Sequence, residues 1–430
     1  MTHIYKSTGM TKKINVQKGE KLVLLPHYIG SLKYFEKLLP TLKDTYRVQF
    51  LFIPRTEKEH FAKEMIEYST AKGYPYSLIT RLRVPLWVKR IPVLADILIL
   101  LDGRRKFRRF LDDSQLQKII CVNDKSPYLN LLFWEAKKRG VQTLLLQWAT
   151  STVKGEDKNT KPTSLRAKVY DGLFYFLLKH LLQCPYRKNR TVGRGLIENF
   201  GVFNQQSYDT FRNAGVPEEK LTIVGSADFD RAYQTLALLT KNVGARNAAA
   251  EDYAIDTKKT NIAIFSTPFY TKDITILSKQ EQLAYFSHII DIIRSVFSES
   301  EADILFKIHP AEDITLYGPL SHRGVKLYDK HTENEKLIFF AHLYICHHST
   351  TNLIPIAMGK DVILLNLLKL KLAKGIEECF SIKKFIDDER EFRQLLADFK
   401  RGTLHKQYEN PERLFTENSL ANIMSWISYH

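Results

Sequence analysis

The chain has 430 residues, 44% of them hydrophobic and 26% charged, which is the composition of a globular protein long enough for two ordinary domains. Its four cysteines lie far apart and form no CxxC pair, so neither a disulfide framework nor a zinc site is expected. This use of cysteine fits a protein of the reducing cytoplasm. The net charge of +17 points to an anionic partner, namely nucleic acid, an acidic membrane surface or an anionic substrate.

The first half of the chain alternates strand-like and helix-like segments. Ser31 is expected to cap a helix that runs to Leu39, and Gly140 is expected to end a helix over 127–139. Alternation of this kind predicts a parallel, doubly wound sheet. The predicted strands are residues 21–27, 46–53, 118–124 and 141–148.

Basic clusters lie beside apolar stretches in this half. Residues 89–90 and 104–109 bracket the apolar stretch 91–101, and residues 173–182 run into the basic cluster 187–190. Basic residues next to exposed apolar surface suit peripheral binding to acidic lipid headgroups, whereas a core helix with solvated basic ends would give the same pattern. No nucleic-acid-binding motif accompanies the charge, so no nucleic acid partner is expected. No apolar run can span a bilayer, and no signal peptide is expected at the start.

The second half repeats the alternation after a polar stretch. Residues 150–163 form a predicted loop, 204–211 a helix and 221–224 a short strand, while 240–260 is either a helix with a solvated end or a linker. A helix is predicted over 280–297 and another through Trp426. The predicted strands of the second α/β domain are residues 261–265, 302–306, 325–328, 342–345 and 361–365.

Two of these strands end in loops rich in cationic and hydroxyl groups. Lys307, His309 and Pro310 follow one strand, and the run Cys346-His347-His348-Ser349-Thr350-Thr351 follows another. Ligands of open α/β sheets bind beside the carboxyl ends of the strands. The two loops therefore predict a phosphate-binding site.

Specific residues in these loops carry a resemblance. Lys307-Ile308-His309-Pro310 with Ser349-Thr350 resembles the paired HP and Ser/Thr motifs of bacterial GT-B sialyltransferases, and the KxHP and Ser-Ser pair of CDP-glycerol glycerophosphotransferases and capsule Kdo transferases. Two more segments, 203–205 with 215–226 and 122–127 with 144–147, are similar to the same broad group, so the likeness covers roughly residues 118–370. One departure is Trp148, because many of these relatives carry a His after the residue that matches Gln147.

The resemblance implies an α/β fold of two facing, doubly wound (Rossmann-like) domains, the GT-B architecture; a two-domain binding protein or epimerase is another interpretation of such a pair. It also implies a cytoplasmic enzyme, peripherally associated with the inner membrane, that builds surface glycans. The expected domains are an acceptor-side domain over 1–200, an interdomain segment over 201–260, a nucleotide-donor domain over 261–410, and a C-terminal helix over 411–430 that packs back on the first domain.

Glycosyl transfer from a nucleotide donor explains the residue types on the donor side. A phosphate leaves with negative charge, and positioned donors that meet this charge lower the barrier. His309 is expected to donate to the phosphate or protonate it, and therefore to be catalytic, although it can also be a structural loop histidine. Ser349 can instead be only a helix cap, and either His347 or His348 can face the ligand. The predicted donor-binding residues are Ser266, Thr267, Lys307, His309, Pro310, Asp329, His348, Ser349, Thr350 and Thr351.

An inverting transferase also needs a base that deprotonates the acceptor hydroxyl. Asp124 is the leading candidate because it ends a predicted buried strand, and capping of the next helix is its alternative role; Glu198 and His27 are reserves. No DxD-type metal motif sits at a strand end, so neither a metal nor another cofactor is expected.

The predicted activity is transfer of an acidic sugar (a sialic-type nonulosonate or Kdo) from a CMP-linked donor to an oligosaccharide or lipid-linked glycan. The alternatives are CDP-glycerol or CDP-ribitol polyol-phosphate transfer, UDP-sugar transfer, and a non-catalytic subunit of glycan assembly, which the missing His at Trp148 would favour.

Overall fold

A computed structural model describes residues 19–54, 59–112, 115–149, 165–186, 191–270, 276–309, 312–347, 349–372 and 376–430. These residues fall into two compact units. The first unit takes its residues from Met1–Leu146, Lys161–Gly201 and Leu420–His430, and the second takes its residues from Gln147–Thr160 and Val202–Ser419.

The first sheet has seven strands in the order β3-β2-β1-β4-β5-β6-β7, and its pairings from β3 to β6 are parallel. Chain order reverses between β1 and β4, which is the topological switch point of a doubly wound sheet. Its strands are β1 Lys21–Leu25, β2 Arg47–Phe52, β3 Tyr76–Leu78, β4 Leu116–Cys121, β5 Gln142–Leu146, β6 Asn199–Val202 and β7 Leu221–Ile223.

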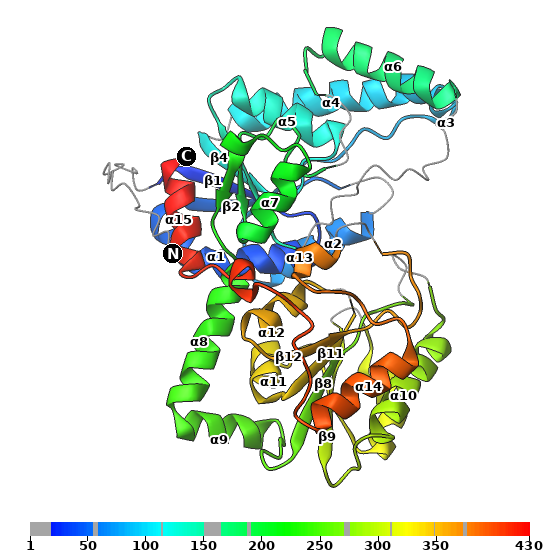
Figure 1. The fold of residues 1–430 in the computed structure, drawn as a ribbon. Coiled ribbons are helices and arrows are strands. Elements are labelled where there is room, and N and C mark those ends of the chain that lie inside the picture. The colour runs from blue at the N-terminus through cyan, green and yellow to red at the C-terminus, as the bar shows by residue number, and fades with distance from the viewer. Residues whose placement is uncertain are drawn as a thin grey trace. The chain divides into compact units, whose positions relative to one another are not determined.

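Helices connect these strands as crossovers. In Figure 1 they are the blue to green helices, and α5 contacts β5 while α4 contacts both α5 and α6. Their bounds are α1 Ile29–Thr45, α2 Glu59–Ala71, α3 Leu86–Lys89, α4 Pro92–Asp112, α5 Pro127–Lys137, α6 Leu165–His180 and α7 Gln205–Asn213, with the 3-10 turn η1 Glu218–Lys220 before β7.

The start of α1 differs from the prediction. Tyr28 is the N-cap residue, and Ser31 lies inside the helix, where its hydroxyl accepts from the amides of His27 and Tyr28 at 2.8 and 3.1 Å. The predicted cap at Ser31 is therefore wrong. The helix also runs through Pro40 to Thr45, past the predicted end at Leu39, because Leu38, Leu39 and Leu42 continue its buried face.

The second sheet has five strands in the order β10-β9-β8-β11-β12, all parallel, with the switch point between β8 and β11. Its strands are β8 Thr260–Phe265, β9 Ala302–Lys307, β10 Val325–Tyr328, β11 Leu343–Cys346 and β12 Asp361–Leu364. Neighbouring residues of β8 point to opposite faces: Ala263 and Phe265 join one hydrophobic cluster, and Ile262 and Ile264 join another. Both faces of the sheet are covered, as parallel sheets require.

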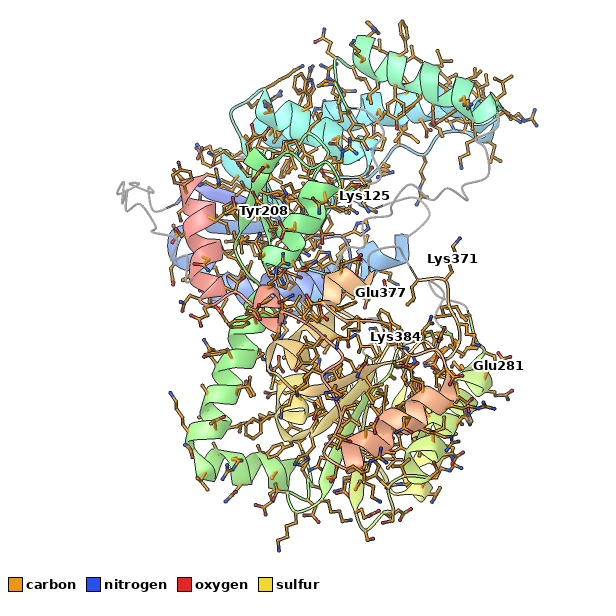
Figure 2. The ribbon with its side chains drawn as sticks, in the orientation of Figure 1. Lys125, Tyr208, Glu281, Lys371, Glu377 and Lys384 are labelled. Atoms are coloured by element: carbon orange, nitrogen blue, oxygen red, sulfur yellow. The ribbon has the colours of Figure 1, made fainter. Side chains whose placement is uncertain are left out.

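The helices of the second unit supply those covers. Their bounds are α8 Ala227–Lys241, α9 Val243–Asp252, α10 Lys279–Arg294, α11 Asn334–Phe340, α12 Leu353–Ala357, α13 Ile376–Phe380 and α14 Glu389–Lys400, with 3-10 turns η2 Ile314–Arg323, η3 Thr350–Asn352 and η4 Pro411–Leu414. Figure 2 shows Glu281 near the start of α10, where its carboxylate accepts from the Ser278 amide and completes a capping box. The last helix is α15 Ser419–Tyr429.

The strands predicted from the sequence are confirmed to within a few residues at their ends. The stretch 240–260, predicted as helix or linker, contains the end of α8 and all of α9. The predicted domain limits at 200, 260 and 410 stay predictions. The loop 150–163 and the basic cluster 187–190 lie outside the described residues. Of the helices described, none combines the length and the apolar character needed to cross a membrane.

Candidate functional site

Three loops leave the same edge of the second sheet. β8 pairs with β9 on one side and with β11 on the other, so the carboxyl ends of these parallel strands meet around the switch point. The loop after β8 carries Ser266 and Thr267, the loop after β9 carries His309, and the loop after β11 carries Ser349. This is the position at which open α/β sheets bind ligands.

A buried carboxylate, that of Glu312, joins two of these loops. It accepts hydrogen bonds from the hydroxyls of Ser266 and Tyr317, the latter at 2.6 Å, from the Gln282 side-chain amide, and from the backbone amide of His309 at 3.0 Å. Burial raises the pKa of Glu312, while these hydrogen bonds act to lower it. Because both oxygens have partners from three segments of chain, the carboxylate fixes the loops after β8 and β9 as one body.

His309 is held by its own backbone. Its amide donates to the hydroxyl of Ser266 at 2.8 Å as well as to Glu312. Burial, and then the nearby charge of Lys307, lowers the pKa of the imidazole to about 4. The ring is therefore neutral at pH 7 in the unliganded protein. A neutral imidazole can donate one N–H to a phosphate oxygen, and an adjacent phosphate would favour its protonated form.

Lys307 lies beneath this loop as the last residue of β9. Its side chain is buried, and its ammonium donates to the carbonyl of Ile308 at 3.1 Å. Burial lowers the pKa of Lys307 to about 8, and the charges of Asp329 and Glu335 oppose that shift. A buried ammonium with one backbone partner is an energetic cost that an anionic ligand would offset.

The loop after β11 is organised by Ser349 and Asn352. Ser349 is the N-cap of η3, and its hydroxyl accepts from the amide of Thr351 at 3.3 Å. Asn352 is fully buried; its side-chain amide donates to the carbonyl of His347 at 2.5 Å and accepts from the Tyr344 hydroxyl at 3.2 Å. The predicted cap role of Ser349 is thus observed, and it leaves the predicted phosphate contact as a prediction.

His347 packs beneath its loop. Its Nε2 lies 2.7 Å from the hydroxyl of Tyr285, and its ring stands edge-on to Phe269 with centroids 4.9 Å apart. His347 is therefore built into the core. His348 and Pro310, both predicted to bind the donor, lie outside the described residues.

Asp329 shapes the turn after β10. Its Oδ1 accepts from the amides of His331 and Thr332 and from the Thr332 hydroxyl, at 2.9 to 3.1 Å. Burial acts to raise the pKa of Asp329, but these hydrogen bonds outweigh it and the pKa is lowered. The carboxylate lies at the ligand-binding edge, and its predicted contact with a base or ribose stays a prediction.

Asp124, in the first unit, holds a turn of the backbone through its carboxylate. Its side chain is fully buried, and its two oxygens accept from the amides of Gly193 at 3.0 Å and Gly195 at 2.8 Å. A Cβ on Gly195 would stand 2.6 Å from Asp124 Oδ2, so this close approach requires glycine. A carboxylate enclosed in this way holds a turn, which favours a positioning role over the predicted role of general base.

The two reserve bases differ in position. Glu198 precedes β6, and its carboxylate accepts from the amide of Thr143 near the start of β5, so it lies toward the amino ends of the strands. His27 lies two residues beyond β1, at the carboxyl edge, where β1 and β4 flank the switch point of the first sheet. His27 therefore lies at the ligand-binding edge and Glu198 does not.

Gln147, which precedes the departure at Trp148, has a structural partner. Its side-chain carbonyl accepts from the amide of Phe203 at 2.8 Å, and its amide group donates to the carbonyl of Ala149 at 3.3 Å. Ser226, from the other segment of the resemblance, caps α8 after Gly225 in a left-handed turn of φ +86°. Gln147 thus fixes the chain at Phe203, and Ser226 caps a helix.

The site residues that the sequence analysis missed are Glu312, Gln282 and Asn352. Glu312 stands three residues after His309, the spacing at which a carboxylate folds back onto a preceding amide, and that signal was available in the sequence. Gln282 and Asn352 come from helix starts, and nothing in their local pattern marks them. Within the described ranges, no cluster of three or more His, Cys, Asp or Glu side chains is placed to hold a metal ion.

Comparison with known proteins gives likeness in fold. No family model and no curated protein sequence matches the chain. The glycosyltransferase of kitacinnamycin has a TM-score of 0.57 at 12% identity, over 94% of this chain and 95% of its own. UDP-GlcNAc 2-epimerase from Methanocaldococcus jannaschii has a TM-score of 0.53 at 13% sequence identity, over 95% of this chain and 100% of its own. A variant of the wall teichoic acid polymerase TagF has a TM-score of 0.50 at 12% sequence identity, over 95% of this chain and 87% of its own.

At these identities the likeness shows the fold alone. The chain has two parallel-sheet, Rossmann-like domains of the GT-B type, which confirms the predicted fold class. The narrower resemblance to sialyltransferases and Kdo transferases finds no matching family model.

Proposed function

We propose that this protein is a glycosyltransferase that moves an acidic sugar, a sialic-type nonulosonate or Kdo, from a CMP-activated donor to a surface glycan. The observation that carries the proposal is the Glu312 carboxylate, which fixes Ser266 and His309 at the switch point of the second sheet, with the Lys307 ammonium buried beneath them. A rigid group of donors around one buried cation suits a phosphate whose charge develops during the reaction.

On the donor side, the bond between the anomeric carbon and the phosphate oxygen breaks, and the phosphate keeps the electron pair. His309 donates a hydrogen bond or a proton to that oxygen, and Lys307 offsets the charge. Ser266, Thr267, Ser349, Thr350 and Thr351 supply hydroxyl and amide donors to the nucleotide, with Pro310 and His348 in the same loops. Asp329 is assigned to the ribose or base.

On the acceptor side, a hydroxyl oxygen bonds to the anomeric carbon and gives its proton to a base. We assign that base to His27, because it stands at the carboxyl edge of the first sheet and imidazole is the most common general base of enzymes. Asp124 holds the turn at Gly193 and Gly195 and positions the same edge.

The nucleotide is assigned as CMP because a single leaving phosphate needs less neutralisation than a diphosphate. One lysine, one imidazole and a set of hydroxyls match that requirement, and the proposed reaction uses neither a metal nor a further cofactor.

A second candidate is transfer of glycerol or ribitol phosphate from a CDP-linked donor. The Lys307-His309 and Ser349-Thr350 pairs suit that chemistry equally, and the wall teichoic acid polymerase TagF has the same fold. UDP-sugar transfer ranks behind it, and the epimerase neighbours include one bound to UDP-GlcNAc. A non-catalytic assembly subunit is the remaining alternative, suggested by Trp148.

We further propose that the enzyme acts at the cytoplasmic face of the inner membrane, on an oligosaccharide or lipid-linked glycan acceptor, and has no nucleic acid partner. Purified protein would be tested with CMP, CDP and UDP and their sugar or polyol conjugates, measuring the rise in melting temperature and then turnover. Stabilisation by CMP together with transfer from a CMP-sugar supports the proposal. Stabilisation by CDP-glycerol with transfer of glycerol phosphate would replace it with the second candidate, and stabilisation by none of these nucleotides would refute both.

A further inference from the structure

Helix α6 carries apolar side chains on its outward face. Leu165, Val169, Leu173 and Phe176 follow one another at spacings of four, four and three residues, so they share one side of the helix. Their side chains are 48% to 78% exposed. The opposite side of α6 faces the protein, because Phe174 on that side is buried; its ring contacts those of Tyr170 and Tyr175. These four residues are called the α6 stripe.

The short helix α3 adds a second apolar feature. Leu86 is 80% exposed and Trp87 is 68% exposed, although the neighbouring Val88 is buried in a small cluster with Val84 and Ala95. Leu86 and Trp87 are called the α3 tip. A soluble surface rarely leaves a tryptophan and a leucine this open next to each other, and such apolar surface marks an interaction site.

The α6 stripe and the α3 tip belong to one group of helices. α4 contacts both α3 and α6, and Tyr170 on α6 donates a hydrogen bond to Asp96 on α4. Figure 1 shows α6 lying along α4, with α3 near one end of both. The apolar side chains are therefore presented on a packed helical scaffold within the first unit.

The exposed charged side chains around these apolar residues are all positively charged. In the described stretches 83–109 and 165–185, every exposed charged residue is basic, and no exposed residue is Asp or Glu. The three aspartates of these stretches are partly buried; Asp96 accepts from the Tyr170 hydroxyl, and Asp102 pairs with Lys106 at 2.7 Å. Exposed lysines and arginines with exposed leucine, valine and phenylalanine are what an acidic lipid surface attracts and then accommodates.

We infer that the α6 stripe and the α3 tip insert into the headgroup region of an anionic bilayer, with basic residues of α4 and α6 against the lipid phosphates. This inference rests on the proposed membrane location and deepens it by naming the surface. Nucleic acid fits less well, because exposed aliphatic side chains such as Leu86 and Leu165 gain nothing from phosphates or base edges.

The structure also separates the basic residues of α4 into two sets. Arg104 and Arg108 bind the buried carboxylate of Glu135 at 2.7 and 2.9 Å, so they are structural. Arg105 and Arg109 are exposed. A test that neutralises all four, as the sequence alone would suggest, would disturb the Glu135 site as well as the surface.

The experiment is co-sedimentation of the full chain with vesicles of phosphatidylglycerol and phosphatidylcholine, compared with vesicles of phosphatidylcholine alone. We expect binding to the anionic vesicles that weakens with salt. Leu173→Gln with Phe176→Gln should weaken it at least about tenfold, because glutamine keeps the helix and removes the apolar contact. Arg105→Gln, Arg109→Gln and Lys168→Gln together should do the same, since each basic residue near an anionic surface contributes about fivefold.

Matched controls come from the second unit. Leu238 and Val243 are 54% and 56% exposed, and their change to Gln should alter vesicle binding by less than about twofold. The same should hold for Lys241→Gln, Lys258→Gln and Lys383→Gln. Failure of the chain to bind anionic vesicles, or equal loss in the controls, overturns the inference. Tighter binding to duplex or single-stranded RNA than to vesicles, or a dimer that Leu173→Gln with Phe176→Gln dissolves, would also overturn it.

Nucleotide binding is measured in parallel by melting temperature. Because no residue of the α6 stripe lies in the proposed donor site, the vesicle variants should keep the wild-type shift with CMP. Loss of vesicle binding with an intact nucleotide response refutes only the membrane surface, whereas vesicle binding without any nucleotide response refutes only the transferase.

Discussion

The backbone amide of His309 donates to the side-chain hydroxyl of Ser266 at 2.8 Å, across the ends of two neighbouring parallel strands. The two residues are far apart in the sequence, and Glu312 accepts from both. The position of the His309 main chain at this edge of the sheet is thus set by Ser266 and Glu312.

Replacing Glu312 by Gln should loosen this arrangement. Glutamine keeps the volume but places an NH2 group where a carboxylate oxygen accepted hydrogen bonds, so buried donors lose a partner. We expect a loss of about 1–3 kcal/mol in the free energy of unfolding, measured by denaturant titration, and at least about tenfold weaker nucleotide binding. Glu281→Gln, on the exposed start of α10, is the control. Unchanged nucleotide binding in a folded Glu312→Gln protein would contradict the positioning role.

Replacing His309 by Gln tests the chemical role. Glutamine can donate a hydrogen bond but cannot deliver a proton, so kcat should fall about 10²- to 10⁴-fold while nucleotide affinity changes little. The measurement is steady-state transfer together with the melting-temperature shift in CMP. A variant that binds CMP and transfers at the wild-type rate would reduce His309 to a structural loop residue.

Lys307 should make nucleotide affinity depend on pH. Burial lowers its pKa to about 8, so the unliganded protein loses this charge as pH rises through that value. Affinity for an anionic nucleotide should be flat below about pH 8 and fall by up to about tenfold per unit above it, with proton uptake on binding. Isothermal titration in buffers of different ionisation enthalpy measures both. Lys307→Arg keeps its charge and should abolish the decline; persistence of the decline would assign it to another group.

The free energy of unfolding should rise with pH over the same range in which nucleotide affinity falls. Between about pH 8 and the ordinary lysine pKa of 10.5, the unfolded chain holds the Lys307 proton and the folded chain does not. The unfolded state therefore binds more protons, and this residue's contribution to the free energy of unfolding rises with pH. Lys307→Met should remove that rise, which denaturant titrations at several pH values would measure against the wild type.

Substitutions of Asp124 and His27 should have different effects, because Asp124 positions the chain and His27 is the proposed base. Asp124→Asn places an NH2 group against the amides of Gly193 or Gly195 and should cost about 1–3 kcal/mol of unfolding free energy, with a parallel loss of activity. His27→Gln should leave stability nearly unchanged and lower kcat, because glutamine cannot accept the proton of the acceptor hydroxyl. Near-wild-type stability in Asp124→Asn with activity abolished would return the base role to Asp124.

The sequence predicted the architecture well because parallel strands leave strong local signals. Apolar runs such as Ile119 to Cys121 are buried on both sides and end at polar residues, so each strand and its carboxyl end could be located. The loops after β9 and β11 could therefore be predicted to meet at one site.

The partners inside the site could not be predicted in the same way. Asp124 and Glu312 are both carboxylates that follow a strand, and the sequence analysis assigned a chemical role to Asp124 and none to Glu312. What separates them is which distant segments approach: glycine amides for Asp124, and Ser266, Gln282 and Tyr317 for Glu312. The predicted N-cap at Ser31 was wrong because Tyr28 is the N-cap and Ser31 is the N3 residue, whose hydroxyl accepts from the Tyr28 amide in a capping box.

Lys118, in the middle of the first sheet, has a consequence for how the chain is made. Its buried ammonium donates to the carbonyl of Ile427 at 2.7 Å, in the last turn of α15. Residues 420–430 leave the ribosome only after the whole second unit has been synthesised. The first unit therefore waits for the second before this ammonium gains its carbonyl partner, and during that interval the nascent first sheet lacks its contact with α15.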